Sequence, residues 1–250
     1  MRAYLTLTRR ELGGYFMSLT GYVVMALTLF LVGLSFVALL EVLQREPTAM
    51  PVTELFHVTW YFLLILMLPT PVITMRLFAL EKFSGTFETL MTTPVRDLEV
   101  VLAKFSAALL FYVIMWLPHI GCLWVVCHYT NSPAALEAGA IGSTFLGIVL
   151  LGSLFLSLGC LASALTNSQV IAAMISLAFG LSMFMLAYLA DQLPSRTTWP
   201  QQVLASFALF EQMRDFARGV VDTRAIVFHG TLTFFFLFLT LRIVESRRWK

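Results

Sequence analysis

The chain has 250 residues, of which 59% are hydrophobic and 12% are charged. Soluble domains carry roughly 25% charged residues, so this composition cannot cover a globular surface with ionic groups and excludes an ordinary soluble fold. The formal net charge of +2 is too small and too scattered to form a nucleic-acid groove, so no nucleic acid is expected as a partner.

Residues 1–16 predict a helix that lies on the membrane surface before the first span. Polar residues recur there at a spacing of three or four: Arg2, Thr6, Arg9 and Gly13. An apolar stripe adjoins them: Leu5, Leu12 and Phe16. Glu11 interrupts this pattern. The uncharged run over residues 12–40 is far longer than the apolar part of a signal peptide, so we expect an uncleaved first span.

Six apolar segments are long enough to cross a bilayer, at about residues 21–40, 57–75, 100–128, 140–165, 170–190 and 225–241. Residues 138–190 hold no charged residue, and as one helix they would measure roughly 80 Å against a membrane core of about 30 Å. The polar cluster at residues 166–169 therefore predicts a turn between the fourth and fifth spans. We expect an all-α integral membrane protein whose residues 1–250 form a single transmembrane domain.

Six spans place both termini on one side of the membrane, and the distribution of Lys and Arg selects the side. Most of the basic residues lie on the side of the termini. Most of those on the other side lie in one long loop, where the rule is weakest. We therefore expect both termini in the cytoplasm.

Two connecting segments are too long to be simple turns. In residues 76–99, which we place in the cytoplasm, apolar residues recur at the spacing of an amphipathic helix that starts at Glu81: Phe83, Phe87, Leu90 and Met91. Pro94 ends this helix, because the residue before a proline avoids the helical conformation. Such a helix suits docking to a cytoplasmic partner, and a surface helix without a partner is the alternative. The outer segment 191–224 predicts one or two short helices between Gln201 and Gly219.

The residue types that bind metals or react with substrates are sparse. Three cysteines lie in apolar stretches and are expected to be packed thiols: Cys122, Cys127 and Cys160. His119 and Cys122 have a spacing that could bind a metal, but we favour a histidine hydrogen-bonded inside the bundle and expect no metal. A membrane protease would need a Ser–His pair or paired aspartates at depth. The six predicted spans contain no Asp or Glu, so we expect no catalytic residue.

Small residues recur at helical spacing in the fourth and fifth spans: Ser153, Ser157, Gly159, Ser163, Ala172, Ser176 and Gly180. Such ridges let membrane helices approach closely. We favour packing within one subunit over a dimer face.

Residues 71–95, which read PVITMRLFALEKFSGTFETLMTTPV, resemble the hallmark loop of the ABC-2 type transporter permeases. Members of that family show a proline-led Met-Arg, a Glu-Lys or Glu-Arg, a Gly-Thr, a Glu-x-Leu and a Pro-Val. Lys104 matches a lysine that often opens their third span, whereas Leu80 and Phe83 depart from the pattern. Residues 9–12 resemble the N-terminal interfacial helix of the family. Residues 210–211, 216–222 and 245–249 resemble its gliding-motility (GldF-like) branch.

The resemblance implies a permease subunit of an ATP-driven exporter in the bacterial inner membrane. The loop helix would be the first coupling helix against an ATPase subunit, and the turn after the fourth span would be the second. The outer helices would cap the exit. The ATPase-coupling residues would be Arg76, Glu81, Lys82, Phe83, Gly85, Thr86, Phe87, Glu88, Leu90, Met91, Pro94, Asn167 and Ser168.

The resemblance also implies the partners. The chain lacks a phosphate-binding loop, so it is not expected to be an enzyme or to bind a cofactor, and a separate ATPase would bind ATP and Mg. A second permease chain, either a copy or a paralogue, and membrane lipid would complete the assembly. The alternative is a stand-alone six-helix channel or secondary transporter. Spans almost free of ionisable residues disfavour it, because such proteins usually bury charges along the path. No residue is identified as cargo-binding.

Overall fold

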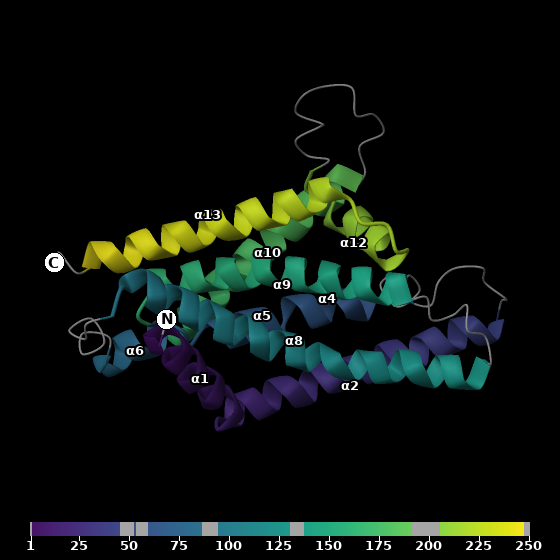
Figure 1. Cartoon of the computed structure of the whole chain (residues 1–250), viewed down its shortest axis with the longest axis horizontal. Helices are drawn as coiled ribbons and strands as arrows, with labels where there is room; N and C mark the ends of the chain where they lie inside the picture. Colours follow the sequence, from purple (N-terminus) through teal and green to yellow (C-terminus); the bar gives the residue numbers. More distant parts are fainter. Residues whose placement is uncertain are drawn as a thin grey trace.

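A computed structural model describes residues 2–45, 53, 60–86, 95–130, 138–191 and 206–247. Within these residues every element is a helix (Figure 1): α1 (Arg2–Phe16), α2 (Leu19–Arg45), α4 (Trp60–Met67), α5 (Pro69–Thr74), α6 (Ala79–Ser84), α8 (Asp97–Thr130), α9 (Ala138–Leu165), α10 (Gln169–Asp191), α12 (Leu209–Ala217) and α13 (Thr223–Arg247). Six stretches are long and apolar enough to cross a membrane: Leu19–Val42, Leu64–Ser84, Asp97–Val126, Gly139–Leu165, Gln169–Leu189 and Thr223–Ser246. The prediction of an all-α protein with six spans is confirmed.

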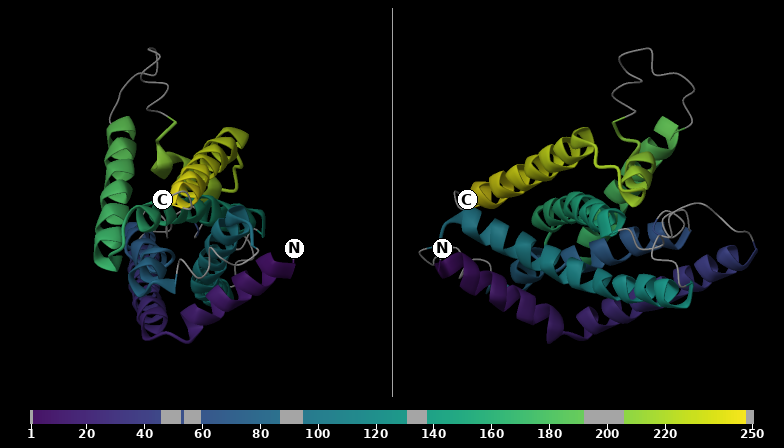
Figure 2. Two further views of the ribbon diagram at one scale, coloured as in Figure 1. Left: turned by 90° about the vertical axis from the view of Figure 1, so that its left-hand side faces the viewer. Right: turned by 45° about the vertical axis from the view of Figure 1, so that its right-hand side comes forward.

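The helices form an elongated bundle with two distinct ends (Figure 1). We call the end where α1 begins, α13 ends and α6 lies the proximal end, and the end that carries α12 the distal end. In the end-on view of Figure 2, α1 and α10 lie at opposite edges of the bundle.

The second predicted span is two helices rather than one. Helix α4 ends at Met67, and α5 begins at Pro69. Proline has no N–H to donate and its ring clashes with the preceding turn, so it is readily accepted in the first turn of a helix, where Pro69 and Pro71 lie in α5. The hydroxyls of Thr70 and Thr74 donate to backbone carbonyls four residues earlier, at 3.0 and 2.8 Å. Residues 57–59, where this span was predicted to begin, lie outside the described part of the chain.

Helix α9 is the centre of the bundle. In its most apolar stretch 72% of the residues are buried, against 22% in α10 and 17% in α13. It packs against α5, α8, α10, α12 and α13. A Cβ added at Gly152 would lie 2.2 Å from the Tyr112 ring of α8, so this close approach of α8 to α9 requires glycine.

The small-residue ridges pack within the chain, as predicted. Ser153 Oγ on α9 lies 3.3 Å from Thr233 Oγ1 on α13. On α10, Ala172 and Ser176 are buried, and a Cβ added at Gly180 would lie 3.4 Å from the ring of Phe155.

The buried face of α1 keeps two residues of the predicted apolar stripe, since Leu12 and Phe16 pack against the core. Leu5 is 62% exposed, whereas Thr8 and Tyr15 are buried. Tyr15 Oη donates to the carbonyl of Ile73 at 2.9 Å, and Tyr4 Oη donates to Ser106 Oγ at 2.7 Å. A polar tip with a hydrogen-bond partner can face the bundle, so these residues join Leu12 and Phe16 on the buried face.

The helix predicted over residues 81–91 begins earlier and is interrupted. Helix α6 starts at Ala79 and ends at Gly85, whose φ of +73° is readily adopted only by glycine. Residues 87–94 lie outside the described residues. The turn predicted after the fourth span is confirmed, since α9 ends at Leu165 and α10 begins at Gln169. One of the predicted outer helices is present as α12, and Gly219 follows it with a φ of +89°.

Candidate functional site

A cluster of four charged residues joins three helices at the proximal end. Lys104 of α8 places its Nζ 2.8 Å from Glu81 Oε1 of α6 and 3.3 Å from Glu11 Oε1 of α1. Arg10 Nη2 lies 3.0 Å from the same Glu11 oxygen and 3.4 Å from the same Glu81 oxygen. We call Arg10, Glu11, Glu81 and Lys104 the ionic cluster. Two cations bridge two carboxylates in it, so its net charge is zero.

Burial makes the ionic cluster a strong constraint on the helices. The Lys104 side chain is 3% exposed, and its ammonium lies 5.6 Å from the centre of the Phe78 ring. A buried charge without a partner costs several kcal/mol of solvation free energy, so the geometry in which Lys104 meets both carboxylates is favoured over any geometry that separates them. The cluster therefore holds α1 and α6 against α8.

A second set of contacts fixes α6 to the proximal end of α9. Ser163 Oγ accepts hydrogen bonds from the backbone N–H groups of Phe78 and Ala79, at 3.0 and 3.1 Å. These are donors at the start of α6 that the helix itself cannot satisfy. Lys82 Nζ donates to the carbonyl of Ala164 in the last turn of α9, where a cation is favoured by the helix dipole.

Glycine allows α5, which leads into α6, to lie directly against α9. A Cβ added at Gly159 would lie 2.1 Å from Thr74 Oγ1, a distance that real Cβ atoms do not reach. Helices α5 and α6 and the end of α9 thus form one packed unit. We call this unit, together with the α9–α10 turn, the proximal platform.

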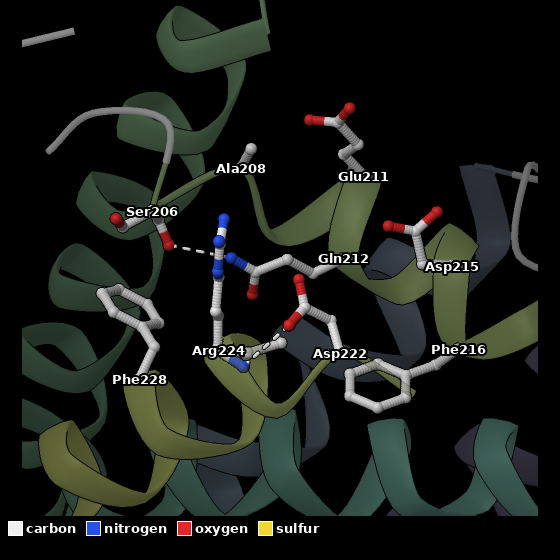
Figure 3. A pocket seen from close by; sticks show the side chains of 10 residues that line it. Ser206, Ala208, Glu211, Gln212, Asp215, Phe216, Asp222, Arg224 and Phe228 are labelled. Carbon is white, nitrogen blue, oxygen red and sulfur yellow. Dashed lines mark hydrogen bonds between the residues drawn. The ribbon is translucent and has the colours of Figure 1, made fainter. Parts of the chain in front are cut away.

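The distal end carries a cavity of about 470 Å³ between α12 and the start of α13 (Figure 3). Figure 3 shows Gln212, Asp222 and Arg224 gathered across its middle, with Glu211 and Asp215 on the α12 side. Gln212 Nε2 donates to the Ser206 carbonyl at 2.9 Å, and Asp222 Oδ1 accepts from Arg224 N at 2.8 Å. A cavity of this size with both polar and aromatic walls can hold a small molecule.

One carboxyl group in this distal cavity, that of Asp215, has a shifted pKa. Asp215 lies outside the membrane-spanning segments, and its pKa is raised above the ordinary value of 3.8. Burial is the largest cause, followed by the negative charge of Glu211, and Asp222 adds to it. Protonation of Asp215 therefore occurs at a higher pH here than in an unfolded chain.

Helix α12 is seated on the distal half of α9. Ser143 Oγ of α9 donates to the Phe216 carbonyl at 2.6 Å. A Cβ added at Gly147 would lie 2.9 Å from Met213 Sδ and 3.0 Å from Phe216 Cβ. The buried face of α12 thus fits into a space that only glycine leaves on α9.

A comparison with protein families matches residues 51–242 to the family of ABC-2 family transporter proteins, well over half of the chain. The chain belongs to the ABC-2 transporter family. A search of curated proteins finds no match. Members of this family are membrane components of ABC transporters and are not themselves catalytic, so this ABC-2 protein is a membrane component too.

The ABC-2 protein brings several of the predicted coupling residues to its proximal end. Phe83 is 78% exposed and available to a partner. Gly85 ends α6, and Thr86 Oγ1 lies 2.8 Å from Ser84 Oγ just beyond it. Asn167 and Ser168 form the α9–α10 turn. The remaining members of the predicted first coupling helix lie outside the described residues: Phe87, Glu88, Leu90, Met91 and Pro94.

Three predicted coupling residues make contacts within the chain, and their coupling role stays a prediction. Glu81 contacts Lys104 and Arg10 in the ionic cluster, and Lys82 donates to the end of α9. Arg76 Nη1 donates to Thr20 Oγ1 at the start of α2. These side chains shape the platform from within.

The sequence-based site omitted four residues: Ser163 of the platform, and Arg10, Glu11 and Lys104 of the ionic cluster that contacts α6. Glu11 had left a signal, because it interrupts the pattern of α1 and a buried partner for it accounts for the interruption. Lys104 is the only charged residue in the predicted third span, which also indicates a partner. Ser163 had been assigned only to a packing ridge.

His119 and Cys122 do not change this picture. The His119 ring lies between the rings of Trp116 and Phe145, with centroid distances of 6.1 and 6.4 Å. Cys122 is half-buried on the same helix. The His119 ring is thus packed inside the bundle, and the hydrogen bond expected for it stays a prediction.

Proposed function

We propose that this chain is the permease subunit of an ATP-driven ABC exporter, with its proximal end in the cytoplasm of a bacterial cell and its spans in the inner membrane. The observation that carries the proposal is the proximal platform. It joins the segments after the second and fourth spans into one unit, so a partner that moves this unit moves several spans together.

The surface of the platform supports docking. Around the two joined segments, three apolar side chains are exposed: Phe83, Leu165 and Val170 are 78%, 48% and 68% exposed. The charged side chains of Glu81 and Lys82 are turned toward the chain itself. A partner at this surface would therefore meet mainly apolar side chains and backbone.

The ATPase would be a separate subunit that binds ATP and Mg, because the chain has no phosphate-binding loop. A second permease chain, identical or paralogous, would supply the other half of the translocation path through the membrane. The distal cavity would lie on the exit side. The resemblance of the C-terminal region to the gliding-motility branch stays a prediction about relationship and names no cargo.

The test is purification of the chain in mild detergent from its native membranes, with mass spectrometry of the proteins that accompany it. We expect a stoichiometric subunit with a phosphate-binding loop. Phe83→Asp should reduce the recovered ATPase several-fold, because a charge would face an apolar contact. Val220→Asp is the matched control, since Val220 is 56% exposed at the opposite end of the bundle. A chain that always purifies alone would favour the stand-alone transporter or channel instead.

A further inference from the structure

Helix α9 contacts both the proximal platform and the distal helix α12. At its proximal end α9 binds α6 through Ser163 and Ala164, and at its distal end it carries α12 against Ser143 and Gly147. We infer that α9 transmits movement of the proximal platform to α12 and the distal cavity, with Gly159 and Gly147 as positioning residues. This inference rests on the proposed function, because the movement would originate at the ATPase.

The rigidity of α9 is the first argument. The helix runs from Ala138 to Leu165 without a proline, so its hydrogen-bond ladder is not interrupted by a missing N–H. The second span has no such continuity, since it divides at Pro69. A helix of 28 residues measures roughly 42 Å, longer than the membrane core. A displacement at one end of such an uninterrupted helix can be carried to the other end.

The closeness of the contacts is the second argument. A Cβ at Gly159 would lie 2.1 Å from Thr74 Oγ1, and a Cβ at Gly147 would lie 2.9 Å from Met213 Sδ. No gap separates α9 from α5 or from α12 at these two points. Close-packed interfaces move as units and do not deform continuously, so a shift of α5 and α6 displaces α9, and a shift of α9 displaces α12.

The part of α12 that contacts α9 also forms part of the wall of the distal cavity. Met213 and Phe216 hold α12 on α9, and Phe216 together with Glu211 and Asp215 of the same helix lines the cavity. Helix α10 adds an apolar contact, with the rings of Phe184 and Phe210 at 5.0 Å. A movement of α12 relative to α13 would thus change the size of the cavity.

Hydrogen–deuterium exchange tests this transmission in the complex purified with its ATPase from native membranes. Exchange is compared without nucleotide and after trapping with MgATP and vanadate, in α6 and in residues 206–219. We expect a nucleotide-dependent change in both segments of the wild type. In Gly147→Ala the change in residues 206–219 should be lost while that in α6 remains, because the added Cβ displaces α12 from its seat.

Gly142→Ala is the matched control, since it adds the same methyl to the same helix with no atom within 4 Å, and it should behave as wild type. Ser143→Ala is a second variant that removes the hydrogen bond to α12 without adding bulk, and it should weaken the distal change too. A distal change that survives unaltered in both Gly147→Ala and Ser143→Ala overturns the inference. So does a wild type in which only α6 responds. If no ATPase accompanies the wild type, or α6 does not respond, the proposed function itself fails.

Discussion

Replacing Lys104 with methionine tests whether the ionic cluster holds the proximal platform together. Methionine has a similar length and no charge, so the substitution leaves Glu11 and Glu81 without their shared cation. Their side chains are 18% and 14% exposed, which limits the water that could replace the lysine. Arg10 remains within 3.4 Å of Glu81, but its side chain is 58% exposed and most of its interaction is screened.

The expected loss follows from the distances and the burial. At an effective dielectric constant of about 20, charges 2.8 Å apart attract each other by roughly 6 kcal/mol before desolvation is subtracted. Removing one partner of a buried ion pair costs about 3–5 kcal/mol in measured cases. Because Arg10 stays in place, we expect a decrease of about 3 kcal/mol in the free energy of unfolding of Lys104→Met.

Unfolding in mixed micelles, followed by tryptophan fluorescence, measures this loss. Arg242→Met is the control, because Arg242 and Glu245 form an exposed pair at 2.9 Å that is worth about 0–1 kcal/mol. Adding Glu81→Gln to Lys104→Met should restore about 1 kcal/mol or more, since it removes one of the two carboxylates that lost the buried cation and kept only the exposed Arg10. If Lys104→Met loses no more stability than Arg242→Met, the cluster does not hold the platform and the reasoning is wrong.

Two further predictions concern the two ends of the bundle. Ser163→Ala removes the acceptor of two backbone N–H groups and should lower the free energy of unfolding by about 1–3 kcal/mol. Ser157→Ala is the control, because its hydroxyl donates to a carbonyl of its own helix. Its free energy of unfolding should stay within about 0.5 kcal/mol of wild type in the same assay. Because the pKa of Asp215 is raised, the folded protein binds a proton at this carboxyl group more tightly than the unfolded chain does. The contribution of Asp215 to the stability of the fold therefore falls as the pH rises from 3.8 through the folded-state pKa. The melting temperature of Asp215→Asn should therefore rise relative to wild type across that range, and a difference that stays constant or declines with pH contradicts the assignment.

The spans could be predicted from the sequence because their signal is local. A bilayer requires about twenty apolar residues in a row, and only the six predicted segments supply them. The ends of the helices are less certain, because a helix can continue into the polar headgroup region. Helix α13 was predicted to leave the membrane near residue 241, yet it stays helical to Arg247, past Arg242 and Glu245. Hydropathy locates the part inside the membrane and gives no information on the part beyond it.

The platform could be predicted only in outline. The loop motif and the turn at residues 166–168 both lie in segments that form the platform, but the partners of their side chains are set by tertiary packing. Ser163 lies 84 residues from Ala79 in sequence, and no periodicity relates the two. The interruption of α6 at Gly85 was missed because the apolar spacing of residues 83–91 continues across it.

The partners of the charged residues at the proximal end were the hardest to predict from the sequence. These partners also bear on which side chains of α6 could contact another protein. The resemblance to the ABC-2 permeases places Glu81 and Lys82 among the predicted ATPase-coupling residues. In a bundle with so few ionisable groups, however, a buried lysine such as Lys104 needs a carboxylate nearby, and the adjacent loop can supply one. Glu81 meets that need at 2.8 Å, and Lys82 is used by the end of α9. The side chain of α6 that remains most available to a partner is Phe83, so recognition at this helix is expected to depend on apolar contact more than on charge.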